Sequence, residues 1–263
     1  MNVAGRTVLL TGATGGLGHA VARRLHAAGA ELRLTGRRAD VLAPLAAETG
    51  ARSIALDLAD PAAVMDLAIQ CADVDILVAA AGLPASGQLT SFTVEEIDRA
   101  LAVNLRAPMV LARHLAERMV ARRSGHLVFM SSLSGKVWTA RGSVYSATKF
   151  GLRGFAQSLR EDLRPSGVGV SAVFPGFVRD AGMFHDAGVK VPPWVGTSTS
   201  AAVAEAVLQA IEHDRGEVDV APLGVRAGAK VAGLAPDLAA SVQRKLGGEK
   251  IAEQHVTGQA DKR

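Results

Sequence analysis

Short β-forming runs alternate with longer helical stretches along most of this chain, and this alternation constrains the fold more than any other feature. The predicted strands are residues 7–10, 31–35, 52–56, 76–79, 126–130, 169–173 and 218–221. The run at residues 76–79, for example, is uniformly apolar, as expected of a strand covered by helices on both faces. Regular alternation of this kind predicts an α/β fold in which a doubly wound parallel sheet of about seven strands is flanked by helices.

The predicted helical stretches are residues 17–28, 39–49, 61–70, 93–122, 144–163 and 200–213. Asp60 before Pro61, for example, has the order of an N-cap followed by a proline in the first turn. Residues 182–197 lack regular periodicity and are expected to form a long loop. We therefore predict one domain, residues 1–224, and a basic, alanine-rich appendage, residues 225–263. We expect this appendage to pack on the body as one or two helices rather than to bind an anionic membrane surface.

Composition excludes several classes of protein. The 263 residues include one cysteine, Cys71, which rules out a disulfide framework and favours a reducing compartment. No secretory leader is recognisable and no apolar run is long enough to cross a bilayer, so a cytoplasmic protein without an integral membrane segment is expected. The net charge of +4 is scattered and aromatic residues make up 4% of the chain, which argues against a nucleic-acid partner.

A glycine-rich turn follows the first predicted strand and opens the first helix, with the sequence Thr11-Gly12-Ala13-Thr14-Gly15-Gly16-Leu17-Gly18. Glycines here allow a tight turn and a close backbone approach to a pyrophosphate, while the helix N-terminus offers free amides to the anion. The spacing is Gly-x-x-x-Gly-x-Gly, which differs from the general dinucleotide pattern. The turn predicts a single-domain Rossmann-type nucleotide-binding fold; the alternative is a glycine-rich connection that binds no ligand.

The residues after the second predicted strand bear on the choice between NAD and NADP. An acidic residue there would hold a ribose 2′-hydroxyl, but this chain has Arg37 and Arg38 instead. A guanidinium can bind a 2′-phosphate through charge-assisted hydrogen bonds. We therefore predict NADP as the cofactor, with Arg37 as the principal contact and NAD as a possible substitute. The alternative is that both arginines are solvated in a turn.

Tyr145 and Lys149 lie four residues apart in a predicted helix, so the phenol and the ammonium can enter one pocket. Such a pair on its own is more often a pair of exposed side chains on a solvated helix. Here it follows the glycine turn and Ser132, which comes directly after a predicted strand. This combination indicates an active site.

With these motifs in this order, the chain resembles the short-chain dehydrogenase/reductase family over residues 5–223. The resemblance also rests on Asp57, Ala80-Ala81-Gly82, Asn104 and Pro175-Gly176. It implies that the catalytic residues are Asn104, Ser132, Tyr145 and Lys149. It further implies a cofactor-binding set that comprises Gly12, Thr14, Gly16, Leu17, Gly18, Arg37, Arg38, Asp57, Leu58, Ala81, Gly82, Tyr145, Lys149, Pro175, Gly176 and Val178.

The resemblance assigns Asp57 to the adenine, Gly82 to the adenosine ribose, and Asn104 to a water that links Lys149 to solvent. The alternative for Asn104 is an amide that satisfies a break in the helix near Pro108. The resemblance also implies a homodimer or homotetramer built through the helices at residues 93–122 and 144–163.

Hydride transfer to or from a nicotinamide requires a proton transfer at the substrate oxygen. The ordinary pKa of tyrosine, about 10, is too high for a base near neutrality. We expect the Lys149 ammonium and an oxidised nicotinamide to lower the pKa of Tyr145 and favour its phenolate. Ser132 would hold the carbonyl or alkoxide oxygen by a hydrogen bond.

Two positions depart from the family pattern. The chain has Ala79-Ala80 where the family often has two asparagines, which predicts weaker polar anchoring at the centre of the sheet. Asp180 lies near the place of a family threonine that contacts the nicotinamide carboxamide; an ionised carboxylate can accept from that amide but cannot donate. Backbone groups of Val178 are the expected replacement.

The predicted substrate residues are Ser132, Trp138, Tyr145, Met183, Phe184 and Trp194. Their apolar character predicts a lipophilic ketone or aldehyde and its alcohol, although these side chains would also simply pack the loop onto the body. His185 has no neighbours at metal-ligand spacing, so no metal site is predicted.

The leading hypothesis is an NADP-dependent oxidoreductase in which Tyr145 acts as general acid and base. Two alternatives stay open: a dinucleotide-sensing or scaffold protein without turnover, and an epimerase that uses the same site through a transient ketone.

Overall fold

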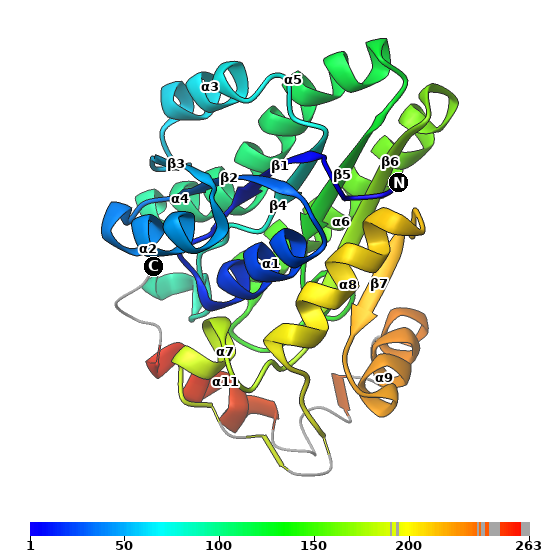
Figure 1. Ribbon diagram of the computed structural model, residues 1–263. Coiled ribbons are helices and arrows are strands. Elements are labelled where there is room, and N and C mark those ends of the chain that lie inside the picture. The colour runs from blue at the N-terminus through cyan, green and yellow to red at the C-terminus, as the bar shows by residue number, and fades with distance from the viewer. Residues whose placement is uncertain (190, 193–194, 236, 238–239, 242–247, 259–263) are drawn as a thin grey trace.

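The chain folds around a seven-stranded parallel sheet with the strand order β3-β2-β1-β4-β5-β6-β7 (Figure 1). The computed structural model describes residues 1–189, 191–192, 195–235, 237, 240–241 and 248–258. The strands are β1 Thr7–Thr11, β2 Glu31–Gly36, β3 Arg52–Ala55, β4 Ile76–Ala79, β5 Gly125–Met130, β6 Val168–Pro175 and β7 Glu217–Val220. The predicted sheet of about seven strands is confirmed, with each boundary shifted by at most two residues.

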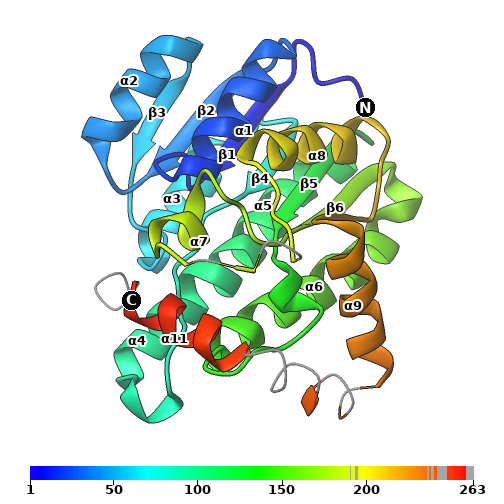
Figure 2. The ribbon, with the colours of Figure 1, turned by 90° about the horizontal axis from the view of Figure 1, so that it is seen from below.

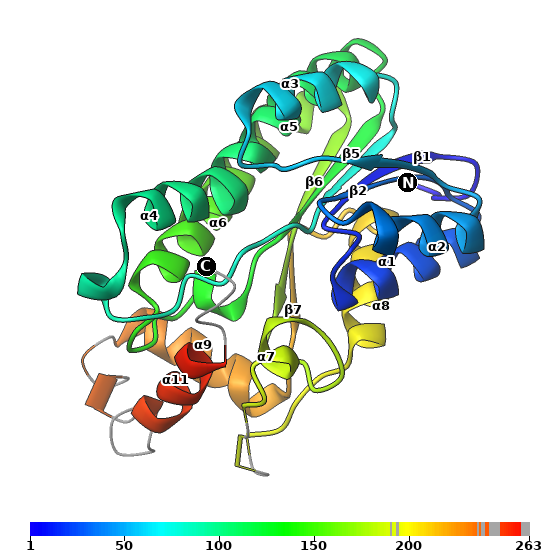
Figure 3. The same cartoon turned by 90° about the vertical axis from the view of Figure 1, so that its left-hand side faces the viewer.

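Helices cover both faces of the sheet, as Figure 3 shows in side view. One layer contains α1 (Gly16–Ala27), α2 (Ala39–Thr49) and α8 (Ser200–Glu212). The other contains α3 (Pro61–Gln70), α4 (Val94–Leu101), α5 (Ala107–Ala121) and α6 (Ser143–Leu163). Each layer encloses a separate apolar core against its face of the sheet. Because helices cover both of their faces, the central strands β1, β4, β5 and β6 are mostly buried and largely apolar rather than alternating.

Helices α7 (Gly182–Asp186), α9 (Leu223–Leu234) and α11 (Gly248–Thr257) lie beyond the carboxyl edge of the sheet, at the lower end of Figure 1. The expected loop at residues 182–197 thus contains the short helix α7, which is too short to produce a periodic pattern. Helix α9 begins at Leu223, so the predicted start of the appendage falls within this helix. Within the described residues, no helix combines the length and apolarity needed to cross a membrane.

The stretch predicted as one helix over residues 93–122 is divided by a π-helical turn, Ala102–Arg106. Its cause is Pro108, which has no N–H to donate to the carbonyl of Asn104 four residues earlier. The amide of Ala107 bonds instead to the carbonyl of Ala102, five residues back. Such bulges concentrate at functional sites, and here the turn carries Asn104 toward the interior.

The order of the strands places a crevice at the carboxyl edge. The chain moves outward from β1 to β2 and β3, and then returns to the other side of β1 with β4. In open parallel sheets, ligands bind beyond the carboxyl ends of the strands at such a reversal. The glycine turn after β1 and the residues after β4 therefore meet at one place.

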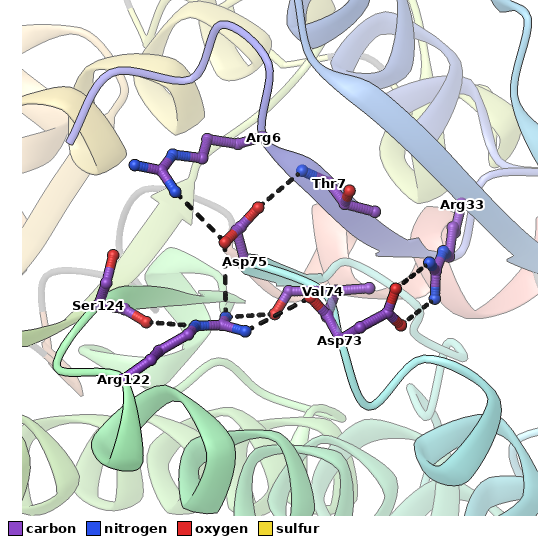
Figure 4. A network of polar contacts seen from close by, with 8 residues as sticks. All are labelled: Arg6, Thr7, Arg33, Asp73, Val74, Asp75, Arg122 and Ser124. Carbon is purple, nitrogen blue, oxygen red and sulfur yellow. Dashed lines mark hydrogen bonds and ion pairs between the residues drawn. The ribbon is translucent and has the colours of Figure 1, made fainter.

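A polar network joins the first strands to α5 at the opposite, amino edge of the sheet (Figure 4). The carboxylate of Asp75 accepts from the backbone N–H of Thr7 at 3.1 Å and lies 3.7 Å from the guanidinium of Arg122. Arg122 also donates to the carbonyl of Val74 at 2.6 Å. These contacts hold the starts of β1 and β4 together at the end of the sheet remote from the crevice. We call residues Arg6, Thr7, Arg33, Asp73, Val74, Asp75, Arg122 and Ser124 the amino-edge network.

Candidate active site

The glycine turn brings backbone close to backbone. Gly12 has a φ of +74°, and a side-chain carbon there would lie 2.7 Å from the Cα of Ala81. A side-chain carbon on Gly18 would collide with the carbonyl oxygen of Gly12. The turn consequently needs glycine at both positions, and its amides at the start of α1 remain open to an anion. Gly16 lies beside Ala181, and Leu17 lines the adjoining cavity.

The side chain of Thr11, the last residue of β1, anchors the residues that follow β4. Its hydroxyl oxygen accepts from the backbone N–H of Ala80 at 3.1 Å and of Ala81 at 3.2 Å. Polar anchoring at the centre of the sheet, which the alanines at 79 and 80 were expected to weaken, is supplied from the neighbouring strand. Ala81 and Gly82 are thereby held beside the glycine turn.

Beyond β2, the two arginines differ in their surroundings. Arg38 donates to the carbonyl of Thr14 at 2.7 Å and so fastens the glycine turn. Arg37 is exposed, and its charge helps to lower the pKa of Asp57. Arg37 thus lies near Asp57, whereas Arg38 contacts the glycine turn.

Asp57 follows β3 and is held on two sides. Burial tends to raise its pKa, but the N–H of Ala59 and the guanidinium of Arg99 outweigh burial and hold the pKa below its usual range. Arg99 lies 2.7 Å from the carboxylate. Sequence reasoning did not identify Arg99, because an ion pair between residues so far apart leaves no local signal. The predicted neighbour Leu58 is buried, with its side chain in the core.

Three of the four predicted catalytic residues, Ser132, Tyr145 and Lys149, line one cavity. Tyr145 lies in the first turn of α6, and the Lys149 amine lies 5.6 Å from the centre of its ring. Ser132 follows β5 and its hydroxyl bonds to the Tyr145 phenol. Lys149 is 3% exposed and donates to the carbonyl of Met130 at 3.0 Å. A side-chain carbon on Gly82 would lie 3.7 Å from the Lys149 amine. The glycine turn and the catalytic side chains thus share one site.

The pKa of Tyr145 differs from the expected one. Burial raises it to about 12, with the hydrogen bond from Ser132 acting in the opposite direction. Burial also lowers the pKa of Lys149 to about 8, because the charged amine is removed from water. In the protein without cofactor, burial is thus the dominant influence on the tyrosine pKa, and the joint effect of Lys149 and an oxidised nicotinamide stays a prediction. In this state the phenol is neutral near pH 7.

Asn104 is fully buried and links two segments of the site. Its amide oxygen accepts from the N–H of Leu83 at 2.7 Å, and its nitrogen donates to the carbonyl of Leu83 at 3.0 Å. The same nitrogen lies 3.4 Å from the hydroxyl of Thr148, which in turn donates to the carbonyl of Tyr145. Asn104 thus positions the loop after β4 against α6. Its own main-chain carbonyl is the one to which Pro108 has no N–H to donate.

After β6, the chain turns at Pro175 and Gly176 and lines the same cavity. Val178 is buried and pairs with Ser198 in an isolated parallel bridge. The carboxylate of Asp180 accepts from the backbone N–H of Ser200 at 2.8 Å and from its hydroxyl at 3.0 Å. Asp180 therefore anchors the start of α8, an interaction that the sequence argument did not foresee.

The cavity has a volume of about 620 Å³. Of the predicted substrate residues, Ser132, Trp138, Tyr145, Met183 and Phe184 line it, and Trp194 lies outside the described residues. The lining also includes residues that sequence reasoning missed, among them Arg141, Val225, Ala240 and Ala252. Across the described ranges, no group of three or more His, Cys, Asp or Glu side chains is placed to hold a metal ion.

Comparison with known proteins finds relatives in both sequence and structure. Residues 6–190 match the family described as short chain dehydrogenase. The ketoacyl reductase HetN of Nostoc sp. is 37% identical over 225 residues, which cover 82% of this chain and 78% of that protein. A short-chain dehydrogenase from Sphingobium yanoikuyae in complex with NADPH superposes with a TM-score of 0.77 at 30% identity, covering 90% of this chain and 95% of that one. A metagenomic short-chain oxidoreductase in complex with NADP gives a TM-score of 0.72 at 34% identity, covering 84% and 99%.

Proposed function

The chain belongs to the short-chain dehydrogenase/reductase family, and on that premise we propose that it is an NADP-dependent reductase of lipophilic ketones or aldehydes. The observation that carries this proposal is the convergence of Ser132, Tyr145 and Lys149 on one cavity beside the glycine turn. A protein that only senses a dinucleotide requires none of these three side chains at the cavity.

The residues beside the crevice fit NADP. Gly12, Gly16 and Gly18 leave a cradle that side-chain carbons would fill, and the exposed Arg37 guanidinium suits a 2′-phosphate. Asp57, already paired with Arg99, lies at the predicted adenine end. The bound NADPH or NADP named for two structural relatives supports the same cofactor here. When bound, the cofactor supplies or accepts the hydride.

The chain's own residues would manage the proton and the substrate oxygen. The neutral Tyr145 phenol donates its proton to the carbonyl oxygen as that oxygen becomes an alcohol. Ser132, bonded to the same phenol, holds the oxygen in place. Lys149, with a pKa of about 8, favours the phenolate that remains after transfer. The hydrogen bonds from Asn104 to Thr148 and from Thr148 to the carbonyl of Tyr145 hold the start of α6 against the loop after β4.

The cavity favours an apolar substrate. Its walls include Leu133, Val137, Trp138, Met183 and Phe184, and Phe184 is braced by Phe177 with ring centres 5.0 Å apart. A volume of about 620 Å³ lies within the range of sites for small organic ligands. The relative named ketoacyl reductase supports a carbonyl substrate with an acyl chain.

The test is a panel of ketones, aldehydes and alcohols assayed with NADPH, NADH and their oxidised forms. Turnover of apolar ketones with NADPH is the expected result. Failure of every carbonyl to react while NADPH binds would contradict the proposal and favour a sensing role. Racemisation with a catalytic amount of cofactor would favour an epimerase.

We further propose a cytoplasmic homo-oligomer assembled through α4, α5 and α6. The partly exposed apolar side chains of Leu101, Met109 and Phe150 on these helices support this assembly. Sedimentation equilibrium measures the mass directly, and a monomer at micromolar concentration would contradict the assembly.

A further inference from the structure

Helix α11 supplies part of the cavity wall, although it lies beyond the residues that match the family. The match ends at residue 190, whereas Val225, Ala240 and Ala252 line the cavity. Figures 1 and 2 show α11 beside α7, which carries Met183 and Phe184 on the same cavity. The chain therefore closes its own site with a segment from its carboxyl-terminal part.

One buried residue and two contacts fix α11 in this place. Ala252 is buried to 9% exposure where it meets the cavity. The carboxylate of Glu253, the next residue, lies 2.7 Å from the guanidinium of Arg141. Gly258 packs so tightly on α7's end that a side-chain carbon there would lie 2.6 Å from the Cα of Ala187. Helix α11 is thus fixed to the two segments that border the cavity.

Arg141 has an unusual backbone that suits this role. Its φ is +59°, a left-handed conformation that residues other than glycine rarely adopt. Its carbonyl accepts from the N–H of Gly87 at 2.7 Å. Arg141 therefore joins the loop after β4, the entrance to α6 and helix α11. Strained positions of this kind cluster at ligand clamps, where the surrounding structure holds them.

We propose that α11 is a specificity-determining wall of the active site, with Ala252 setting the length of apolar substituent that fits and the Arg141–Glu253 pair positioning the helix. The small side chain of Ala252 leaves room that any larger residue would occupy. The proposal concerns an apolar chain of the substrate and rests on the proposed carbonyl-reductase function.

Ala252→Leu tests the wall. Enlarging this side chain should lower kcat/KM for a long 2-alkanone about tenfold or more, because overpacking a filled cavity is unfavourable, and should leave butan-2-one unchanged. Ala47→Leu, at an exposed position of α2, is the matched control. An equal effect on all chain lengths, or none, overturns the proposal.

Glu253→Gln tests the positioning pair. Loss of one exposed ion pair should raise KM for the long ketone about two- to fivefold with kcat retained, and should speed amide exchange across residues 248–258. The double variant R141E/E253R should restore both values, because it re-forms the pair with reversed charges. Glu117→Gln, which removes the exposed pair with Arg113, is the control. No change in either KM or exchange overturns the positioning role.

Binding without turnover separates this proposal from the proposed function. The fluorescence of Trp138, which lines the cavity, should change when decan-2-ol binds, and Ala252→Leu should weaken that binding relative to butan-2-ol. If the alcohol binds with this selectivity but no ketone is reduced, the proposed reductase function is contradicted and the proposed role of α11 is supported. If ketones are reduced and Ala252→Leu leaves the chain-length preference unchanged, the proposed role of α11 is contradicted and the proposed reductase function is supported.

Discussion

Replacing Tyr145 with phenylalanine removes a single oxygen atom from the centre of the candidate site. Because burial raises the pKa of this phenol to about 12, the side chain is neutral near pH 7, as its proposed role of proton donor in carbonyl reduction requires. Phenylalanine fills the same volume but donates no proton. The change therefore separates chemistry from packing.

The expected effects on rate and stability differ widely. Loss of a positioned general acid lowers kcat about 10²- to 10⁴-fold, equivalent to about 3–5 kcal/mol in the activation barrier. The free energy of unfolding loses one hydrogen bond, with Ser132, worth about 0.5–1.5 kcal/mol. For a chain of this size that loss lowers Tm by a few degrees, at most about 6 °C.

Three measurements complete the experiment: single-turnover reduction of a ketone, the Kd for NADPH, and thermal unfolding. The Kd should stay within about threefold of the native value, because the proposed cofactor contacts lie mainly at the glycine turn and Arg37. Ser132→Ala is the companion variant, with a smaller expected loss because it positions the oxygen but carries no transferred proton.

Retention of more than a tenth of the native kcat by Tyr145→Phe would refute the assignment of Tyr145 as proton donor. A fall in rate accompanied by a large fall in Tm would indicate instead that the phenol is a structural group.

Three further outcomes are expected. Tyr145 is the single tyrosine of the chain, so ultraviolet titration of the cofactor-free protein should show no tyrosinate near pH 10. Ser132→Ala should raise the pKa of Tyr145 further, because it removes the hydrogen bond that lowers this pKa. Ionisation of Tyr145 at or below pH 10 would contradict the burial argument. Since the folded pKa exceeds the unfolded one, this group's contribution to stability is complete below about pH 10 and is lost as the pH rises through about 12. Arg37→Glu should lower the ratio of kcat/KM for NADPH over NADH about 10- to 100-fold, and an unchanged ratio would remove Arg37 from the phosphate site. Gly12→Ala should weaken NADPH binding in calorimetry and destabilise the fold by more than about 1 kcal/mol. The control Gly154→Ala, at a position with open surroundings, should have neither effect. Equal effects of the two changes would contradict the requirement for glycine in the turn.

The fold was predictable because its signals are local. Strands buried on both faces must be apolar, and β4 was predicted with the boundaries it has. The division of residues 93–122 was less accessible, since a π turn has no periodicity of its own. Its cause can nevertheless be read from the sequence once Pro108 is paired with the carbonyl four residues earlier.

The candidate site was predictable only where residue type and position together imply a role. Tyr145, Lys149 and Ser132 meet at the cavity, but the direction of the tyrosine pKa depends on burial, which a sequence does not contain. The place of Ala252 in the cavity wall could not be predicted from the sequence, because alanine is common in any helix. The contact between Glu253 and Arg141 joins residues far apart in the chain, and nothing in either local sequence indicates the other.

The amino-edge network has a consequence for redesign of this protein. Its ion pairs fasten β1, β4 and α5 at the end of the sheet farthest from the crevice, so loops at the other end can be exchanged without disturbing them. Libraries aimed at new substrates would best spare Asp75 and Arg122 and concentrate diversity in α7 and α11. Residues of these two helices line the cavity, and changing them leaves the contacts at the amino edge of the sheet in place.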